Sequence, residues 1–131
     1  MIAVDTSVLI AIVLGEPGAQ PCINVLGNEP DIIISAGTLT ESFIVAAGRG
    51  KAADLDRLIA ALNLRVIPHT EASARRASQA YEIWGKGLHP AGLNLGDCFA
   101  YEVAQSNHCP LLYLGNDFSK TDIQSVLPPT P

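Results

Sequence analysis

Charged side chains are scarce in this chain. They make up 16% of the 131 residues, whereas a typical soluble domain carries about 25%. This shortage of polar cover has two explanations. Either an apolar surface is buried against a partner or a second copy of the chain, or the apolar residues form parallel strands that are covered on both faces inside a tightly packed α/β domain.

Positive charge is the scarcer kind. Eight Lys and Arg residues, dispersed along the chain, stand against 13 Asp and Glu residues, and the formal net charge is −5. A domain that binds nucleic acid passively is usually basic. The composition therefore leaves two ways to meet a polyanion, which are bound cations and a basic partner. The same acidity is ordinary for a cytoplasmic enzyme.

Cysteine pairs and long apolar runs are also missing. The cysteines form no CxxC pair, which argues against a disulfide framework or a zinc site and suits a reducing cytoplasm; they are Cys22, Cys98 and Cys109. The longest apolar run, Val8 to Leu14, is far shorter than the roughly 20 residues that cross a bilayer. A strand-like segment begins at Ile2, so we expect no signal peptide.

Strand-like and helix-like segments alternate along the sequence. Short apolar or β-branched runs predict strands at residues 2–4, 31–35, 64–68 and 111–114. Helical spacing with capping and stop signals predicts helices at residues 8–14, 21–26, 38–47, 52–62, 70–84 and 95–106. This alternation is typical of an α/β fold with a parallel sheet and right-handed crossovers. We expect a single domain over residues 1–131, because no linker or repeat interrupts the pattern.

Four carboxylates occupy comparable places in this pattern. Asp5 and Asp117 each follow a predicted strand, and Glu41 and Asp97 each open a helix. Ligands of open α/β sheets bind beyond the carboxyl ends of the strands. We therefore expect these four side chains at one edge of the sheet, although the sequence separates them widely.

Each acid also has a purely structural explanation. Asp5 suits the N-cap of the following helix, although Thr6 and Ser7 could cap it as well. Asp117 follows Gly and Asn in a turn, where Asp is common.

The other two acids have the spacing of a capping box. In this motif the acid reaches back to a free backbone N–H at the start of its helix. Thr38 precedes Glu41 by three positions, and Asn94 precedes Asp97 by three positions. Each acid alone is therefore a weak signal, and the argument for a site rests on the combination.

The charge of such a cluster predicts a bound cation. Two unit charges about 4 Å apart repel by roughly 4 kcal/mol at an effective dielectric constant of 20. Four carboxylates would not all stay ionised together without a cation, and Mg²⁺ or Mn²⁺ is the natural choice because both prefer oxygen ligands. Such an ion polarises a phosphoryl oxygen and lowers the pKa of a bound water. The pattern therefore predicts a metal-dependent phosphodiester hydrolase.

Four segments resemble the motifs of one known family. Val4 to Leu9 (VDTSVL) resembles the first motif of PIN-domain ribonucleases, and Ser35 to Glu41 (SAGTLTE) resembles the second. Leu93 to Tyr101 (LNLGDCFAY) resembles the third motif in the form found in VapC-type toxins. Leu112 to Ile123, with its GNDF and TDI sequences, resembles the fourth. Together they cover nearly the whole chain.

The resemblance implies a three-layer α/β/α PIN-like fold with a short parallel sheet. It also implies an Mg²⁺- or Mn²⁺-dependent endoribonuclease that leaves 5′-phosphate and 3′-hydroxyl ends. Residue by residue, the acidic catalytic and metal-binding quartet matches Asp5, Glu41, Asp97 and Asp117, with Asp5 and Asp97 as the most direct ligands. Three further residues are expected to support the site: Ser7, which can orient Asp5, together with Asn116 and Asp122.

The resemblance implies partners as well. VapC-type toxins act on RNA, are usually homodimers and are held inactive by a VapB-type antitoxin. The antitoxin typically wraps an apolar groove and can push a basic side chain among the acids. Such a partner would account for both the thin polar cover and the negative charge. We therefore expect a cytoplasmic protein with no membrane contact.

Two departures and two alternatives accompany the resemblance. Gly37 stands where a branched residue is commoner, and Leu114 stands where the family often has a basic one. The main alternative is a catalytically inactive PIN-like scaffold that acts only by binding a partner. A haloacid-dehalogenase-type phosphatase would need a second Asp at the position of Ser7.

Overall fold

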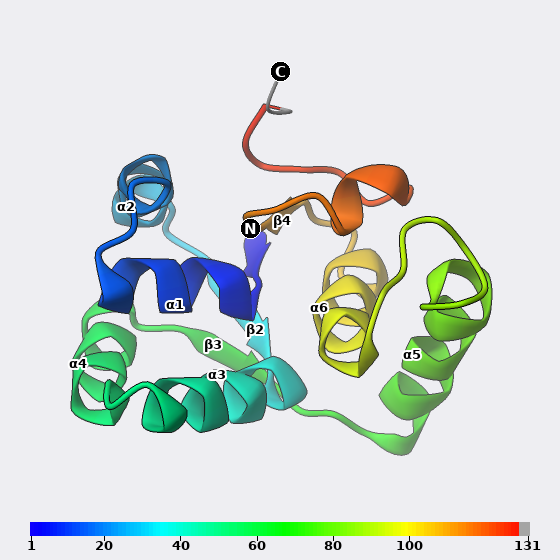
Figure 1. Cartoon of the computed structure of the whole chain (residues 1–131), viewed down its shortest axis with the longest axis horizontal. Helices are drawn as coiled ribbons and strands as arrows, with labels where there is room; N and C mark the ends of the chain where they lie inside the picture. The colour runs from blue at the N-terminus through cyan, green and yellow to red at the C-terminus, as the bar shows by residue number, and fades with distance from the viewer. Residues whose placement is uncertain (129–131) are drawn as a thin grey trace.

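The computed structural model describes residues 1–128, in which strands and helices alternate as the sequence predicts (Figure 1). The strands are β1 (Ile2–Val4), β2 (Ile32–Ser35), β3 (Arg65–Ile67) and β4 (Leu111–Leu112). The helices are α1 (Thr6–Leu14), α2 (Ala19–Asn28), α3 (Ala36–Gly48), α4 (Ala52–Leu62), α5 (Glu71–Trp84) and α6 (Leu95–Ser106). A short 3-10 helix, η1, spans Phe118–Lys120.

The strands form a parallel sheet in the order β3-β2-β1-β4. In the centre of the sheet, Ile2 lies opposite Ile32, and Ala3 lies opposite both Ile33 and Leu111. Parallel strands bring their carboxyl ends to the same edge. The first turns of α1 and α3 and the segment after β4 therefore meet at that edge, as the predicted α/β class requires.

Successive strand residues face two different apolar cores, because side chains alternate across a sheet. Ala3, Ile33 and Leu111 pack against α5 and α6. Their neighbours enter the second core with residues of α1, α2, α3 and α4; these neighbours are Ile2, Val4, Ile32, Ile34 and Leu112. Figure 1 shows α5 and α6 on one side of the sheet and α1 to α4 on the other. The predicted three-layer α/β/α arrangement is therefore confirmed, and strands buried on both faces account for part of the low charge content.

Several element ends differ from the predictions. Asp5, rather than Thr6 or Ser7, is the N-cap of α1. The predicted capping box of Thr38 and Glu41 is wrong. α3 begins earlier, at Ala36, because Ser35 accepts the N–H of Gly37 and caps the helix. By contrast, the predicted capping box at the start of α6 is present.

β4 is shorter than predicted. It covers Leu111–Leu112 instead of residues 111–114. The backbone N–H of Leu114 donates to the hydroxyl of Ser7 at 3.0 Å rather than to a neighbouring strand. The ladder therefore ends early, and the segment that leads to Asp117 turns away from the sheet.

Within residues 1–128, no single helix is long and apolar enough to cross a membrane. Among the residues that the structure describes, only the pair α1 and α2, taken together across a bend of 113°, reaches that length and composition. Both helices contribute buried residues to the second core, among them Val8, Leu9 and Cys22.

Candidate acidic active site

Asp5 is the most deeply buried acid at the carboxyl edge of the sheet. It is 5% exposed. Its Oδ2 accepts the hydroxyl of Ser7 at 2.6 Å and the N–H of Ser7 at 3.1 Å. Burial raises the pKa of Asp5, and the hydrogen bonds from Ser7 oppose that shift. The predicted contact of Ser7 with Asp5 is therefore present, and Ser7 also holds the backbone that follows β4.

Glu41 lies in the second turn of α3 and takes no part in capping it. Its Oε1 accepts the hydroxyl of Thr6 at 2.6 Å, a contact between residues 35 positions apart. Its Oε2 lies over Gly96, where the methyl group of an alanine would come within 1.8 Å of that oxygen. Glu41 therefore reaches across from α3 to the first turns of both α1 and α6.

Asp97 opens α6 and belongs to its cap. Its Oδ2 accepts the N–H of Asn94 at 3.0 Å, while Asn94 Oδ1 accepts the N–H of Asp97 at 2.9 Å. The pKa of Asp97 is raised to about 6, chiefly by burial and further by the charges of Asp5, Asp117 and Glu41. The structure therefore brings Asp5, Glu41 and Asp117 within electrostatic range of Asp97.

Asp117 is the outermost of the four. It is exposed, directly before η1, and Asn116 is exposed beside it. Asp117 is not buried as Asp5 is. Within residues 1–128, its side chain also makes no capping hydrogen bond of the kind that Asp97 makes. The structure thus gives three inner acids and one acid at the rim.

Asp122 has a structural explanation. Its Oδ1 accepts the hydroxyl of Tyr101 at 2.5 Å, and the Tyr101 hydroxyl accepts the indole N–H of Trp84 at 3.1 Å. Burial, together with the hydrogen bond to Asp122, raises the pKa of Tyr101 to about 12. Asp122 therefore fastens the segment after η1 to α6.

The arrangement of donors suits a hydrated cation better than a closed metal cage. Within residues 1–128, no group of three or more His, Cys, Asp and Glu side chains is placed to hold a metal ion. However, Mg²⁺ typically takes one or two carboxylates and keeps several waters. The hydrogen bonds above engage one oxygen each of Asp5, Glu41 and Asp97. Each ionised carboxylate also has a second oxygen that can bind a cation.

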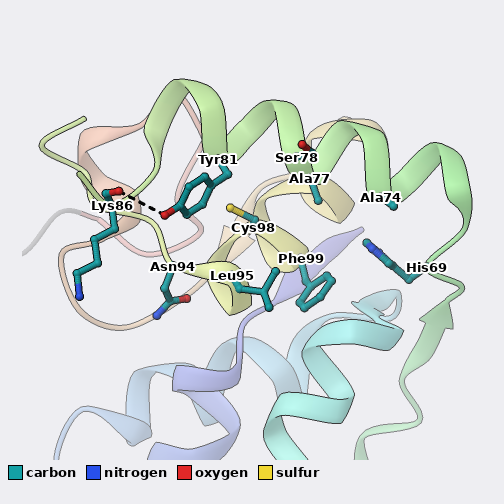
Figure 2. Close-up of a pocket in the computed structure, with 10 residues that line it drawn as sticks. All are labelled: His69, Ala74, Ala77, Ser78, Tyr81, Lys86, Asn94, Leu95, Cys98 and Phe99. Carbon is teal, nitrogen blue, oxygen red and sulfur yellow. Dashed lines mark hydrogen bonds between the residues drawn. The ribbon is translucent and has the colours of Figure 1, made fainter. Parts of the chain in front are cut away.

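An apolar groove continues from these acids along the start of α6. We define it by two adjoining hollows of about 690 and 600 Å³ that share His69, Asn94, Leu95 and Phe99. Glu41 and Gly96 line the second hollow, so the groove opens directly at the site. Figure 2 shows the first hollow, with Tyr81 of α5 beside Cys98 of α6 and with the Tyr81 hydroxyl donating to the backbone oxygen of Lys86.

Large apolar side chains are exposed along this groove. Leu95 is 70% exposed and Ile44 is 68% exposed. Contiguous exposed apolar surface with a polar rim is typical of an interaction site. The low charge content therefore has both of the causes considered above, namely strands buried on two faces and an apolar surface suited to a partner.

The two departures from the family pattern have physical explanations in this structure. A methyl group at Gly37 would come within 2.5 Å of the Phe99 ring, so that ring occupies the space of a branched side chain. Leu114 is partly buried against the second apolar core and lies near Gly18. Its side chain therefore contributes to packing where a basic residue would face solvent or substrate.

Sequence reasoning missed the contacts of Thr6 and Gly96 with Glu41. The sequence marks Thr6 only as an alternative helix cap, and it places Gly96 only beside an acid. Neither contact has a local signal, because each joins residues that are far apart in the chain.

Comparison with known proteins identifies the family. The sequence pattern of the PIN domain matches residues 2–124. Ribonuclease VapC42 of Mycobacterium tuberculosis is 40% identical over 125 residues, which cover 92% of this chain and 95% of that protein. The chain therefore belongs to the PIN-domain family, and within it to the VapC ribonucleases.

Solved structures agree with this fold. The crystal structure of Mycobacterium tuberculosis VapC20, described as a sarcin–ricin loop cleaving toxin, superposes with a TM-score of 0.80 at 18% identity and covers 98% of this chain and all (100%) of VapC20. A toxin–antitoxin complex from Klebsiella pneumoniae gives a TM-score of 0.70 at 21% identity, with 93% of each chain covered. The likeness spans nearly the whole chain, as the sequence motifs predict.

Proposed function

We propose that this chain is a metal-dependent endoribonuclease, the toxin of a type II toxin–antitoxin pair, which hydrolyses RNA phosphodiester bonds. The observation that carries the proposal is the convergence of acids at one sheet edge, where burial and, in addition, the charges of Asp5, Asp117 and Glu41 raise the pKa of Asp97. A divalent cation stabilises neighbouring carboxylates of this kind, because it offsets the repulsion between their negative charges. Relatives about 40% identical over most of their length are named ribonucleases.

In this proposal, Asp5 and Asp97 would hold Mg²⁺ or Mn²⁺, and Glu41 and Asp117 would complete the site. When bound, the cation would supply a water of lowered pKa and polarise a phosphoryl oxygen. The residues of the chain orient and hold these groups. Ser7 fixes the Asp5 carboxylate through two hydrogen bonds. Asp97, with a pKa of about 6, is largely ionised at neutral pH and so can serve as a ligand.

The proposed substrate is RNA in single-stranded or loop form. Duplex RNA hides its bases, whereas loops present unstacked nucleotides that a small site can reach. Glu41 lines the apolar groove and Asp117 is exposed, so the scissile phosphate can approach from solvent. VapC20, which shares the fold, is described as cleaving such a loop.

The test is cleavage of a mixed RNA pool by the purified chain with Mg²⁺ or Mn²⁺, beside an Asp97→Asn variant. We expect cutting by the wild type, loss of cutting with a chelator, recovery with added Mn²⁺ and no cutting by the variant. Equal cutting by both proteins would indicate a contaminating nuclease. Binding of a partner without cleavage of any RNA would instead support the scaffold alternative.

We also propose that a VapB-type antitoxin binds the apolar groove. The groove exposes Leu95 and Ile44 and leads to Glu41, so a segment with large apolar side chains and a terminal cation would match both its surface and its charge. Leu95→Asp should weaken a co-purified toxin–antitoxin complex at least tenfold, whereas Ile23→Asp, an exposed apolar position on α2, should not. A homodimer and a cytoplasmic location stay predictions, the first testable by light scattering of the purified chain.

A further inference from the structure

We infer that Thr6 and Gly96 are positioning residues that together fix the Glu41 carboxylate at the acidic site. The inference rests on the proposed ribonuclease function. Thr6 holds one oxygen of Glu41 by a hydrogen bond, and Gly96 leaves the space that the other oxygen occupies. The two residues come from different helices, so Glu41 is held from two directions.

The hydroxyl proton of Thr6 goes to Glu41. Thr6 Oγ1 lies 2.6 Å from Glu41 Oε1 and 3.3 Å from the carbonyl oxygen of Thr38. A hydroxyl has one proton to donate, and the shorter contact to a charged acceptor is the stronger. Thr6 is 8% exposed, so water does not readily replace this bond.

Ser42 supports the same hydroxyl. Its Oγ lies 3.2 Å from Thr6 Oγ1 and 2.9 Å from the carbonyl oxygen of Thr38, and its single proton is shared between these acceptors. When Ser42 donates to Thr6, it fixes the direction in which the Thr6 proton points. The contribution of Ser42 is therefore smaller than that of Thr6.

Gly96 is required for space rather than for backbone freedom. Its backbone does not adopt the left-handed conformation that favours glycine. A methyl group at this position would come 1.8 Å from Oε2 and 2.5 Å from Cδ of Glu41. Any larger residue beside Asp97 would thus displace the Glu41 carboxylate while keeping the helix intact.

Without the hydrogen bond from Thr6, Glu41 would be free to leave the site, and without the space at Gly96 it could not occupy its present position. Glutamate has several rotatable bonds, and a partly exposed carboxylate gains hydration when it swings into solvent. Residues that orient a metal-binding side chain typically change metal affinity or activity by 10- to 100-fold when they are replaced. We place Thr6 and Gly96 in that role.

The experiment compares four variants of the full chain: Thr6→Val, Thr6→Ser, Gly96→Ala and Thr38→Val. Mn²⁺ affinity is measured by electron paramagnetic resonance, RNA cleavage is measured as kcat and KM, and thermal unfolding checks the fold. Thr38→Val is the matched control, because the Thr38 hydroxyl is buried beside Thr6 but has no hydrogen-bond partner within residues 1–128.

We expect Thr6→Val and Gly96→Ala to bind Mn²⁺ about tenfold more weakly and to lower kcat at least tenfold, with little change in KM for RNA. Thr6→Ser keeps the hydroxyl and should stay within about twofold of wild type. Thr38→Val should match wild type in both measurements. This pattern would separate positioning of Glu41 from a general effect of packing.

Two results would overturn the inference while leaving the ribonuclease proposal intact. The first is a folded Thr6→Val protein with wild-type Mn²⁺ affinity and kcat. The second is an equal loss in Thr38→Val, which would assign the effect to packing. A wild-type chain that neither binds Mn²⁺ nor cleaves RNA would instead refute the proposed function itself.

Discussion

The helices α3 and α6 each bring an acid to the acidic edge within their first two turns, yet they hold these acids in different ways. In α6, Asp97 pairs with Asn94 in a capping box, so the same carboxylate caps the N-terminus of the helix and faces the site. In α3, Ser35 provides the cap, and Glu41 turns away from its own helix to Thr6. The two acids have the same spacing from a capping-type residue, three positions, in the sequence.

The difference shows that a local motif can be satisfied in one helix and overridden in another. Asp97 is oriented by a residue three positions away, whereas Glu41 is oriented by α1 and α6. We therefore expect changes near Asp97 to affect both stability and activity. Changes at Glu41 should affect activity alone, because Glu41 caps nothing.

The largest effect should come from Asp97→Asn. We expect RNA cleavage to fall at least 100-fold, because the change removes a direct ligand of the proposed cation. The melting temperature should hold or rise, since Asn still accepts a backbone N–H and no longer opposes the charges of Asp5 and Glu41. Cleavage assays and thermal unfolding measure the two effects. Activity within tenfold of wild type would contradict the assignment.

Glu41→Gln tests the other half of the comparison. We expect cleavage to fall at least tenfold, because a neutral amide is a weaker partner for a hydrated cation. The free energy of unfolding should change by less than about 0.5 kcal/mol, since Gln still accepts the Thr6 hydroxyl and no cap is lost. Chemical denaturation measures that value. A loss of stability as large as that of a broken cap would show that Glu41 holds α3 together.

The pH dependence of stability should show the effect of Asp97 next. The pKa of Asp97 is raised from 3.8 to about 6, so between these values the folded chain binds more protons than the unfolded chain. Without metal, the contribution of Asp97 to the free energy of unfolding is therefore greatest below about pH 4 and is lost as the pH rises through 6. After allowance for solvent screening, the loss is up to about 2 kcal/mol.

Thermal unfolding in EDTA between pH 4.5 and 7.5 measures this loss, and Asp97→Asn serves as the control. The variant should lack that part of the pH dependence. The raised pKa of Asp5 acts in the same direction, so some dependence should persist. A variant with the full wild-type dependence would show that Asp97 is not its source.

A smaller effect is expected from the two capping-type residues themselves. Asn94→Ala should lower the free energy of unfolding by about 1 kcal/mol, because it removes the cap of α6. Thr38→Val should cost nothing or stabilise slightly, because it removes a buried hydroxyl that has no partner within residues 1–128. Urea denaturation of both variants measures the contrast. Equal costs would mean that both residues cap their helices after all.

The smallest effect should come from Asp122→Asn. The carboxylate accepts the Tyr101 hydroxyl, and weakening that hydrogen bond should cost about 1 kcal/mol or less. Cleavage should stay within about twofold of wild type, since Asp122 acts here as a tether. Denaturation and cleavage measured together decide the point. A tenfold loss of cleavage in a stable protein would make Asp122 a fifth acid of the site.

Local physics explains why the sequence predicted the order of elements so well. Runs such as Ile32 to Ile34 favour a strand wherever they fall, and Thr70 and Asn94 signal helix starts through contacts with residues three positions on. The positions of the acids followed from the same reasoning, because strand ends of a parallel sheet share an edge. These features depend on interactions within a few residues and on the topology they imply.

Only the tertiary structure decided what holds each acid. The hydroxyl of Thr6 reaches Glu41 across 35 positions, and the missing side chain of Gly96 matters only because Glu41 lies above it. The same is true of Tyr101, which binds Asp122 across 21 positions. Spacing in the sequence does not predict such contacts, because they form when helices from distant segments pack against one another around the sheet.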